Sequence, residues 1–136
     1  MSGKEFVDTN ILVYAFDRTA GGKWETAADL LSRLWLERSG CVSLQVLQEF
    51  YVTTTKKLGM PPGEALAQVE RFAKWTVHHP GVDDVLLAIQ LHRVKKVSYW
   101  DAMILRSAMA VGCKVLWSED LKHGQQWDGL EVRNPF

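Results

Sequence analysis

The sequence predicts an α/β protein with a short, mainly parallel sheet that is covered by helices on both faces. Short apolar segments typical of strands alternate along the chain with amphipathic segments typical of helices. Parallel strands need a crossover between them, usually a helix, so this alternation favours a parallel sheet. The length of 136 residues and the apolar share of 47% suit one core, and we expect a single domain over residues 1–136.

The N-terminal part of the sequence predicts a strand, two helices and a second strand in close succession. A strand over residues 6–8 is followed at once by a helix, because Asp8-Thr9-Asn10 consists of residue types that cap helices and disfavour strands. Over residues 23–39, apolar side chains recur at three- and four-residue spacing, which predicts an amphipathic helix. We expect Gly40 to end this helix and residues 41–44 to form the next strand.

Three helices and a turn are predicted in the middle of the chain. One helix covers residues 47–58 and is stopped by glycine and proline, and another begins at Pro62 and runs to about residue 75. Residues 79–81 form a turn. Asp83 and Asp84 then occupy positions where acids favour a helix start, ahead of the apolar run 85–91.

The C-terminal part predicts one more helix and two strands. Ser98 opens a helix that ends near Gly112. Residues 114–117 form a strand, residues 118–121 a helical turn, and residues 130–132 a last short strand.

The composition narrows the possible functions. Sixteen Lys and Arg balance sixteen Asp and Glu, so nucleic acid can be attracted only by a local basic patch. The first residues do not form an apolar leader, and no run of about 18 apolar residues occurs, so we expect a cytoplasmic protein that does not bind membranes. Cys41 and Cys113 form no CxxC pair, which predicts two buried thiols rather than a zinc ribbon or a disulfide.

Two acidic residues follow predicted strands. Asp8 ends the first strand, and Asp120 comes two residues after the strand 114–117. Ligands of open parallel sheets bind beyond the carboxyl ends of the strands, so both carboxylates are expected at one functional edge. A plain helix-capping role is the alternative for each of them.

Two further acids lie on predicted helices. Asp101 occupies the third position of the helix opened by Ser98, on a face that continues with Leu105 and points to the sheet. A carboxylate there is costly unless something compensates it, although a capping box with Ser98 is an equal alternative. Glu49 falls opposite the apolar stripe of its helix, so periodicity alone predicts a solvated side chain; the stripe consists of Leu47, Tyr51, Thr54 and Leu58.

Four sequence blocks together resemble a known family. They are FVDTNILVYA at residues 6–15, LQEF at 47–50, YWDAMI at 99–104 and WSEDL at 117–121, with NPF closing the chain. In this order they resemble PIN-domain ribonucleases, and most of all the VapC toxins of VapBC toxin–antitoxin modules. The resemblance implies a three-layer α/β/α sandwich, a toxin that hydrolyses RNA, and acidic residues that hold Mg²⁺ or Mn²⁺.

The resemblance also implies a set of site residues. The family's four acids fall on Asp8, Glu49, Asp101 and Asp120, which replaces the solvated interpretation of Glu49. We expect Asp8 and Asp101 to bind the metal directly, and the other two acids to position the attacking water or a second ion. Supporting roles beside these acids are expected for Thr9, Asn10, Ser118 and Glu119.

Clustered carboxylates give this expectation a physical basis. Neighbouring negative charges raise one another's pKa, and a hard cation with oxygen ligands relieves the repulsion. Such a cation can lower the pKa of a bound water and offset charge on a phosphoryl group. Zinc is disfavoured because no HxxxH or HExxH spacing occurs among the histidines, which are His78, His79, His92 and His123.

An acidic pocket needs basic side chains on its rim to hold RNA. The candidates flank the third and fourth acids, and they are Arg93, Lys95, Lys96, Lys122 and His123. Trp100 and Trp127 could stack on unpaired bases. Solvated charges and core tryptophans are the alternative interpretation of these residues.

Two other function classes and two partners remain to be considered. A phosphatase-like hydrolase with an aspartyl nucleophile would carry a second acid two residues after Asp8, where this chain has Asn10. A catalytically silent PIN-fold binding module is the non-enzymatic alternative. As partners, the resemblance implies a VapB-type antitoxin and a second copy of the chain, for which the helices of residues 23–75 could supply the interface.

Overall fold

The computed structural model describes residues 3–136 and contains one six-stranded sheet within them. The strands are β1 (Glu5–Val7), β2 (Gly40–Ser43), β3 (Thr76–His78), β4 (Val115–Trp117), β5 (Gln126–Trp127) and β6 (Leu130–Arg133). The helices are α1 (Thr9–Tyr14), α2 (Gly22–Glu37), α3 (Leu44–Lys56), α4 (Pro62–Phe72), α5 (Val82–Lys95) and α6 (Tyr99–Ala110), with a 3₁₀ turn at Arg18–Ala20.

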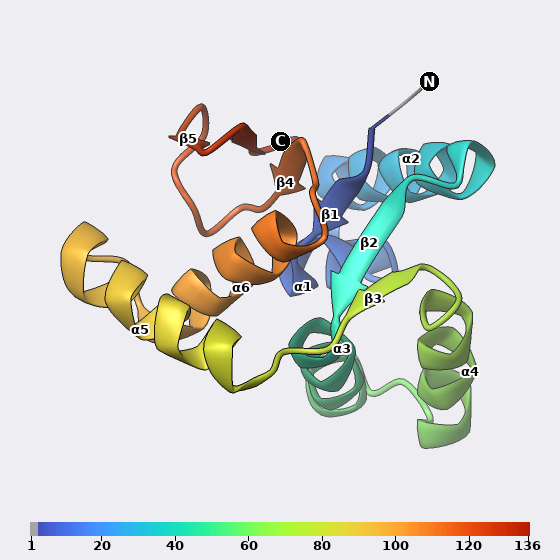
Figure 1. Ribbon diagram of the computed structural model, residues 1–136. Coiled ribbons are helices and arrows are strands. Elements are labelled where there is room, and N and C mark those ends of the chain that lie inside the picture. Colours follow the sequence, from blue (N-terminus) through green and yellow to red (C-terminus); the bar gives the residue numbers. More distant parts are fainter. Residues whose placement is uncertain (1–2) are drawn as a thin grey trace.

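The sheet is mainly parallel, as the alternating pattern predicts. Its strand order is β3-β2-β1-β4-β6-β5, and only the terminal pair β5–β6 is antiparallel. The central strand β1 is buried along its whole length between β2 and β4. Helix α6 packs on one face of the sheet with α5 outside it, whereas α1 and α2 lie on the other face (Figure 1). The predicted three-layer α/β/α sandwich is therefore confirmed.

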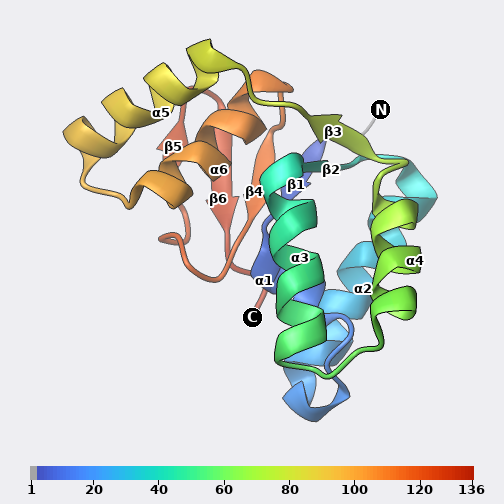
Figure 2. The same cartoon turned by 90° about the horizontal axis from the view of Figure 1, so that it is seen from below.

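Helices α3 and α4 pack against each other and extend beyond the edge of the sheet (Figure 2). Ser43 begins α3, because its hydroxyl accepts a hydrogen bond from the Val46 backbone N–H at 3.3 Å. The buried face of α3 is formed by Val46, Leu47, Phe50 and Thr54. Tyr51, which the predicted apolar stripe included, is exposed, so that stripe was misplaced by part of a turn.

The end of α2 differs from its prediction. Arg38 ends the helix in the left-handed conformation, with φ of 55°, and Gly40 is the first residue of β2. The reason for a glycine lies in packing: a Cβ atom at position 40 would come within 2.6 Å of the Trp75 ring. Gly40 therefore lets the indole lie against the start of β2.

Three smaller expectations are also corrected. Leu44 belongs to α3 rather than to the preceding strand. The segment 118–121 forms bends instead of a helical turn, because the Ser118 hydroxyl accepts hydrogen bonds from the backbone N–H groups of Asp120 and Leu121. The short strands β3 and β5 at the two sheet edges were not predicted, since neither carries a buried apolar pattern.

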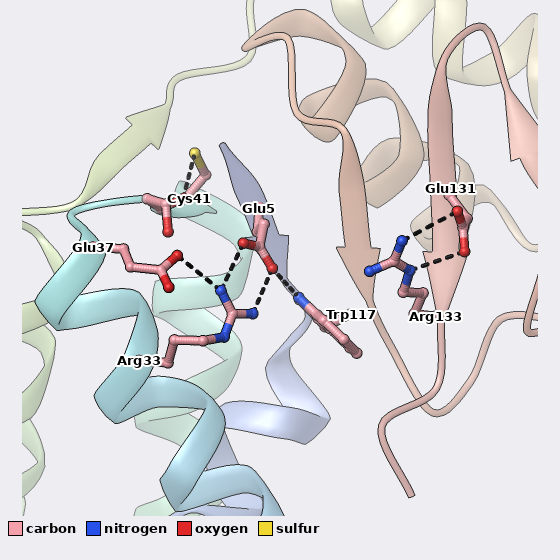
Figure 3. Close-up of polar contacts among 8 residues, drawn as sticks. Glu5, Arg33, Glu37, Cys41, Trp117, Glu131 and Arg133 are labelled. Atoms are coloured by element: carbon pink, nitrogen blue, oxygen red, sulfur yellow. Dashed lines mark hydrogen bonds and ion pairs between the residues drawn. The ribbon is translucent and has the colours of Figure 1, made fainter. Parts of the chain in front are cut away.

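An ion pair between the buried Glu5 and the partly exposed Arg33 ties β1 to α2 at the amino end of the strand (Figure 3). The Glu5 side chain, 3% exposed, accepts two hydrogen bonds from Arg33, at 2.8 and 3.0 Å, and one from the Trp117 indole at 2.8 Å. Burial alone would raise the pKa of Glu5, but these hydrogen bonds hold it below its usual value. The pair fixes β1 between α2 and β4.

The two cysteines are free and buried, as predicted. Within residues 3–136, none of the helices combines the length and the apolar character needed to span a bilayer.

Candidate active site

A cavity of about 780 Å³ lies where β1 ends and is lined by all four predicted acids. Asp8 follows β1, Asp120 follows β4, Asp101 lies in the first turn of α6 and Glu49 in the middle of α3. Because β1 and β4 are parallel neighbours, with Val7 paired to Trp117, their carboxyl ends meet at this edge. The volume is in the range of ordinary ligand sites.

Asp8 is the most buried of the four acids, with 5% of its surface exposed. It caps α1, and its Oδ1 atom accepts a hydrogen bond from the Thr9 backbone N–H at 2.7 Å. Its Oδ2 atom accepts one from the Ser118 hydroxyl, also at 2.7 Å. The pKa of Asp8 is raised to about 7, chiefly by burial; the charges of Asp120 and Glu49 add to this rise, and the two hydrogen bonds partly offset it.

Glu49 is half-buried and belongs to the cavity wall, so the solvated position predicted from periodicity is wrong. Its Oε1 atom accepts a hydrogen bond from the Thr9 hydroxyl at 2.7 Å. Thr9 thus connects the first turn of α1 to α3 through a site acid.

Asp101 enters the cavity from the N-terminal turn of α6. The Ser98 hydroxyl caps this helix by accepting a hydrogen bond from the Asp101 backbone N–H at 3.1 Å. Burial raises the pKa of Asp101, and the nearby charge of Asp120 raises it further. The capping contact therefore uses the backbone of Asp101, while its carboxylate lines the cavity.

Asn10 joins the α1 turn to the segment after β4. Its Nδ2 atom donates to Asp120 Oδ2 at 2.9 Å, and its Oδ1 atom accepts from the Glu119 backbone N–H at 3.2 Å. Asp120 is exposed at the cavity mouth, and this side-chain amide fixes its orientation.

The Glu119 side chain pairs with Lys23 and Tyr14 and is hydrogen-bonded to none of the four acids. Its carboxylate accepts hydrogen bonds from Lys23 and, at 2.8 Å, from the Tyr14 hydroxyl. The Lys23 contact lowers the pKa of Glu119. Glu119 is not part of the cavity lining, so the structure assigns it an anchoring contact rather than a place beside the acids.

The predicted RNA-contact residues divide into two groups. Trp100 lines the cavity and is 63% exposed. The five basic candidates are exposed but lie outside the lining, and these are Arg93, Lys95, Lys96, Lys122 and His123. Trp127 packs against the core, with the Lys95 ammonium 5.9 Å from its ring centre.

Sequence reasoning missed the part of the cavity that α3 provides. The lining includes Gln45, Gln48, Val52, Thr53 and Lys57 in addition to Glu49. These positions recur every three or four residues, so they form one helix face. The signal was present in the sequence, but an exposed helix face resembles any other solvated face until a neighbouring element encloses it.

The acids do not form a complete metal site by themselves. Across residues 3–136, no three His, Cys, Asp or Glu side chains are arranged closely enough to hold an ion. Mg²⁺ typically binds one or two carboxylates and keeps several waters, so it does not need such a cluster. The acids that line the cavity offer oxygen atoms only, which fits a hard cation such as Mg²⁺ or Mn²⁺.

Comparisons with solved structures find the same fold. A toxin–antitoxin complex from Klebsiella pneumoniae aligns over 99% of this chain and 98% of its own, with TM-score 0.73 and 21% identity. VapC20 from Mycobacterium tuberculosis, a toxin that cleaves the sarcin-ricin loop, aligns over 83% and 87%, with TM-score 0.64 and 22% identity. DNA-bound VapBC from Salmonella typhimurium aligns over 99% and 100%, with TM-score 0.68 and 22% identity.

Sequence comparison gives the family. No curated protein sequence matches the chain. The family model for the PIN domain, however, matches residues 6–125, which include all four acids of the cavity. The chain therefore belongs to the PIN-domain family, as its four sequence blocks predict.

Proposed function

We propose that this chain is a metal-dependent endoribonuclease and the toxin of a type II toxin–antitoxin pair. The observation that carries the proposal is the convergence of Asp8, Glu49, Asp101 and Asp120 on one cavity of a PIN fold. We propose that residues 1–136 work as one domain, since the family match spans most of them and the four acids come from distant parts of the chain.

The metal would be held by Asp8 and Asp101, with Glu49 and Asp120 binding through water or a second ion. When bound, Mg²⁺ or Mn²⁺ supplies Lewis acidity, which makes water a better nucleophile and offsets charge on the phosphoryl oxygens. The neutral partners of the acids support this role, because Ser118, Thr9 and Asn10 each fix one carboxylate by a hydrogen bond.

The proposed reaction is hydrolysis of an RNA phosphodiester bond. Water attacks phosphorus, the bond to the 3′ oxygen breaks, and a proton passes to that oxygen, leaving 5′-phosphate and 3′-hydroxyl ends. Glu49 and Asp120 are suited to orient the water, since both line the cavity and each is held through one of its two carboxylate oxygens. Because the 2′-hydroxyl takes no part, selectivity for RNA must come from binding.

The proposed partners follow from the same reasoning. RNA is the substrate, and the cytoplasm is where a toxin of this kind would meet it. Two of the structures with this fold are toxin–antitoxin complexes, which supports a VapB-type antitoxin as the protein partner.

A homodimer is proposed through α5. Six large apolar side chains of α5 are exposed, and only Ala88 is buried; the exposed ones are Val82, Val85, Leu86, Leu87, Ile89 and Val94. The helix is acidic in its first turn and basic in its last. An antiparallel, two-fold pairing of α5 with a second copy would bring Asp83 of each copy to the basic end of the other. We place the interface on α5 because its exposed apolar side chains are concentrated on one helix, whereas those of residues 23–75 are divided among α2, α3 and α4.

The experiment is to incubate total cellular RNA with the wild-type chain, Asp8→Asn and Asp101→Asn, with Mg²⁺ or with EDTA, and to sequence the new 5′ ends. We expect defined cuts by the wild type with Mg²⁺, reduced by at least about a hundredfold in each variant. Glu119→Gln is the matched control, because this acid lies outside the cavity lining.

Two results would contradict the proposal. Equal cutting by wild type and both variants would indicate a contaminating nuclease. Intact RNA with Mg²⁺ and with Mn²⁺, from folded protein, would favour the silent binding module instead.

A further inference from the structure

The cavity continues along α3 well beyond the four acids. The face that lines it runs from Gln45 through Glu49 to Lys57, which follows the last residue of the helix. Lys57 comes about two turns after Glu49, or roughly 12 Å along the axis at 1.5 Å per residue. Figure 2 shows α3 extending away from the sheet in this direction. A ligand that follows the cavity therefore reaches well past the point where the acids meet.

The charge along this cavity is uneven. Five carboxylates belong to the lining, namely those of Asp8, Asp17, Glu49, Asp101 and Asp120. Among the described residues that line it, Lys57 is the single cation. None of the ion pairs found within residues 3–136 involves Lys57. Lys57 is exposed, and it stands at the C-terminal end of α3.

We propose that Lys57 binds a backbone phosphate of single-stranded RNA, one that is not the phosphate being cut. This inference rests on the proposed function, because it takes the substrate strand to lie along α3 from the acids to Lys57. A polyanion that enters a wall of carboxylates needs a positive charge to offset the repulsion, and Lys57 supplies the one charge of that sign in the lining. The neutral side chains of Gln48 and Thr53 line the path between the two ends.

A purely structural role for Lys57 can be distinguished by experiment from phosphate binding. A cation at the C-terminal end of a helix is favoured by the helix dipole, and both Lys56 and Lys57 stand at that end of α3. Lys56 is likewise exposed but is not part of the cavity lining. The neighbouring lysine therefore provides a control with the same charge, the same helix end and no access to the cavity.

The experiment measures binding of a short, fluorescein-labelled single-stranded oligoribonucleotide to wild type, Lys57→Gln and Lys56→Gln. Fluorescence anisotropy is recorded in EDTA over a range of salt concentrations, and the RNA is checked for intactness afterwards. We expect Lys57→Gln to weaken binding and to reduce the slope of log K against log salt by about 0.7, the loss of one phosphate contact. Lys56→Gln is expected to keep the wild-type affinity and slope, and thermal unfolding verifies that both variants fold.

The outcomes separate this inference from the proposed function. If the wild type cuts RNA but the two lysine variants bind equally well, the role of Lys57 is overturned and the ribonuclease stands. If the folded wild type neither binds nor cuts RNA, both are overturned. If Lys57→Gln loses binding to a partner protein but keeps the RNA affinity of the wild type, the inference is also overturned.

Discussion

Asp8 is an acidic side chain that is both buried and part of the cavity lining. Only two neutral donors, the Thr9 backbone N–H and the Ser118 hydroxyl, offset the loss of water around its carboxylate. Its pKa of about 7 means that the chain without a metal holds a proton on Asp8 over much of the range below neutrality. An ionised Asp8 is therefore costly to the stability of the folded chain, and the cation of the proposed function would offset this cost.

We predict that Asp8→Asn stabilises the metal-free chain at alkaline pH. Burial raises the folded-state pKa of Asp8 from 3.8 to about 7. The folded state then binds the proton more tightly than the unfolded state, so this contribution to stability is lost as pH rises through about 7. Asparagine caps helices as well as aspartate does and carries no charge. Thermal unfolding in EDTA at pH 5 and pH 8 measures the effect.

The control for this prediction is Asp29→Asn, which changes an exposed acid of α2. An unfolding temperature of Asp8→Asn equal to or below that of the wild type at pH 8 would contradict it. Added Mg²⁺ should make the unfolding temperature of the wild type higher than that of Asp8→Asn, because a ligand that binds only the folded wild type raises its unfolding temperature.

The elements near the site were the most predictable part of the fold. Asp8-Thr9-Asn10 combines a strand end with a helix start, and the structure has both, with β1 ending at Val7 and α1 beginning at Thr9. Ser98 likewise starts α6 as predicted. These signals succeed because capping is local chemistry, in which a side chain satisfies a backbone group a few residues away.

Features that depend on distant neighbours could not be predicted from local pattern. The role of Gly40 depends on Trp75, which packs on the start of β2. Helical periodicity predicts a solvated Glu49 because it takes no account of α1, from which the Thr9 hydroxyl donates a hydrogen bond to the Glu49 carboxylate. The family resemblance placed Glu49 among the acids, whereas Lys57 had no motif to mark it.

Gly40 offers a direct test of this packing at the level of one element. We predict that Gly40→Ala lowers the free energy of unfolding by about 1–3 kcal/mol, because the new methyl group would overlap the Trp75 ring. Gly63→Ala in α4 is the control, since a Cβ atom there meets nothing within 4 Å and alanine favours the helix by up to about 1 kcal/mol. Urea denaturation measures both. Equal effects of the two substitutions would show that the Trp75 contact is not tight.

At the scale of the whole molecule, α5 is the surface on which the proposed dimer depends. We predict that Leu86→Lys lowers the free energy of dimer dissociation by at least about 2 kcal/mol and so raises the dissociation constant, because a charge would enter an apolar interface. Leu66→Lys in α4 is a matched control, since Leu66 is 53% exposed and Leu86 is 54% exposed. Sedimentation equilibrium measures the dissociation constant. A wild type that is monomeric at every concentration, or a Leu86→Lys variant that dimerises normally, would contradict the interface.

The order of the strands has a consequence for a growing polypeptide. β1 is made first, yet it lies between β2 and β4, and Asp120 follows β4 near the end of the chain. A chain made only as far as residue 114 would leave β1 without its neighbour β4 and would lack Asp120. The cavity with its four acids therefore cannot form until Asp120 and the strand before it have been made.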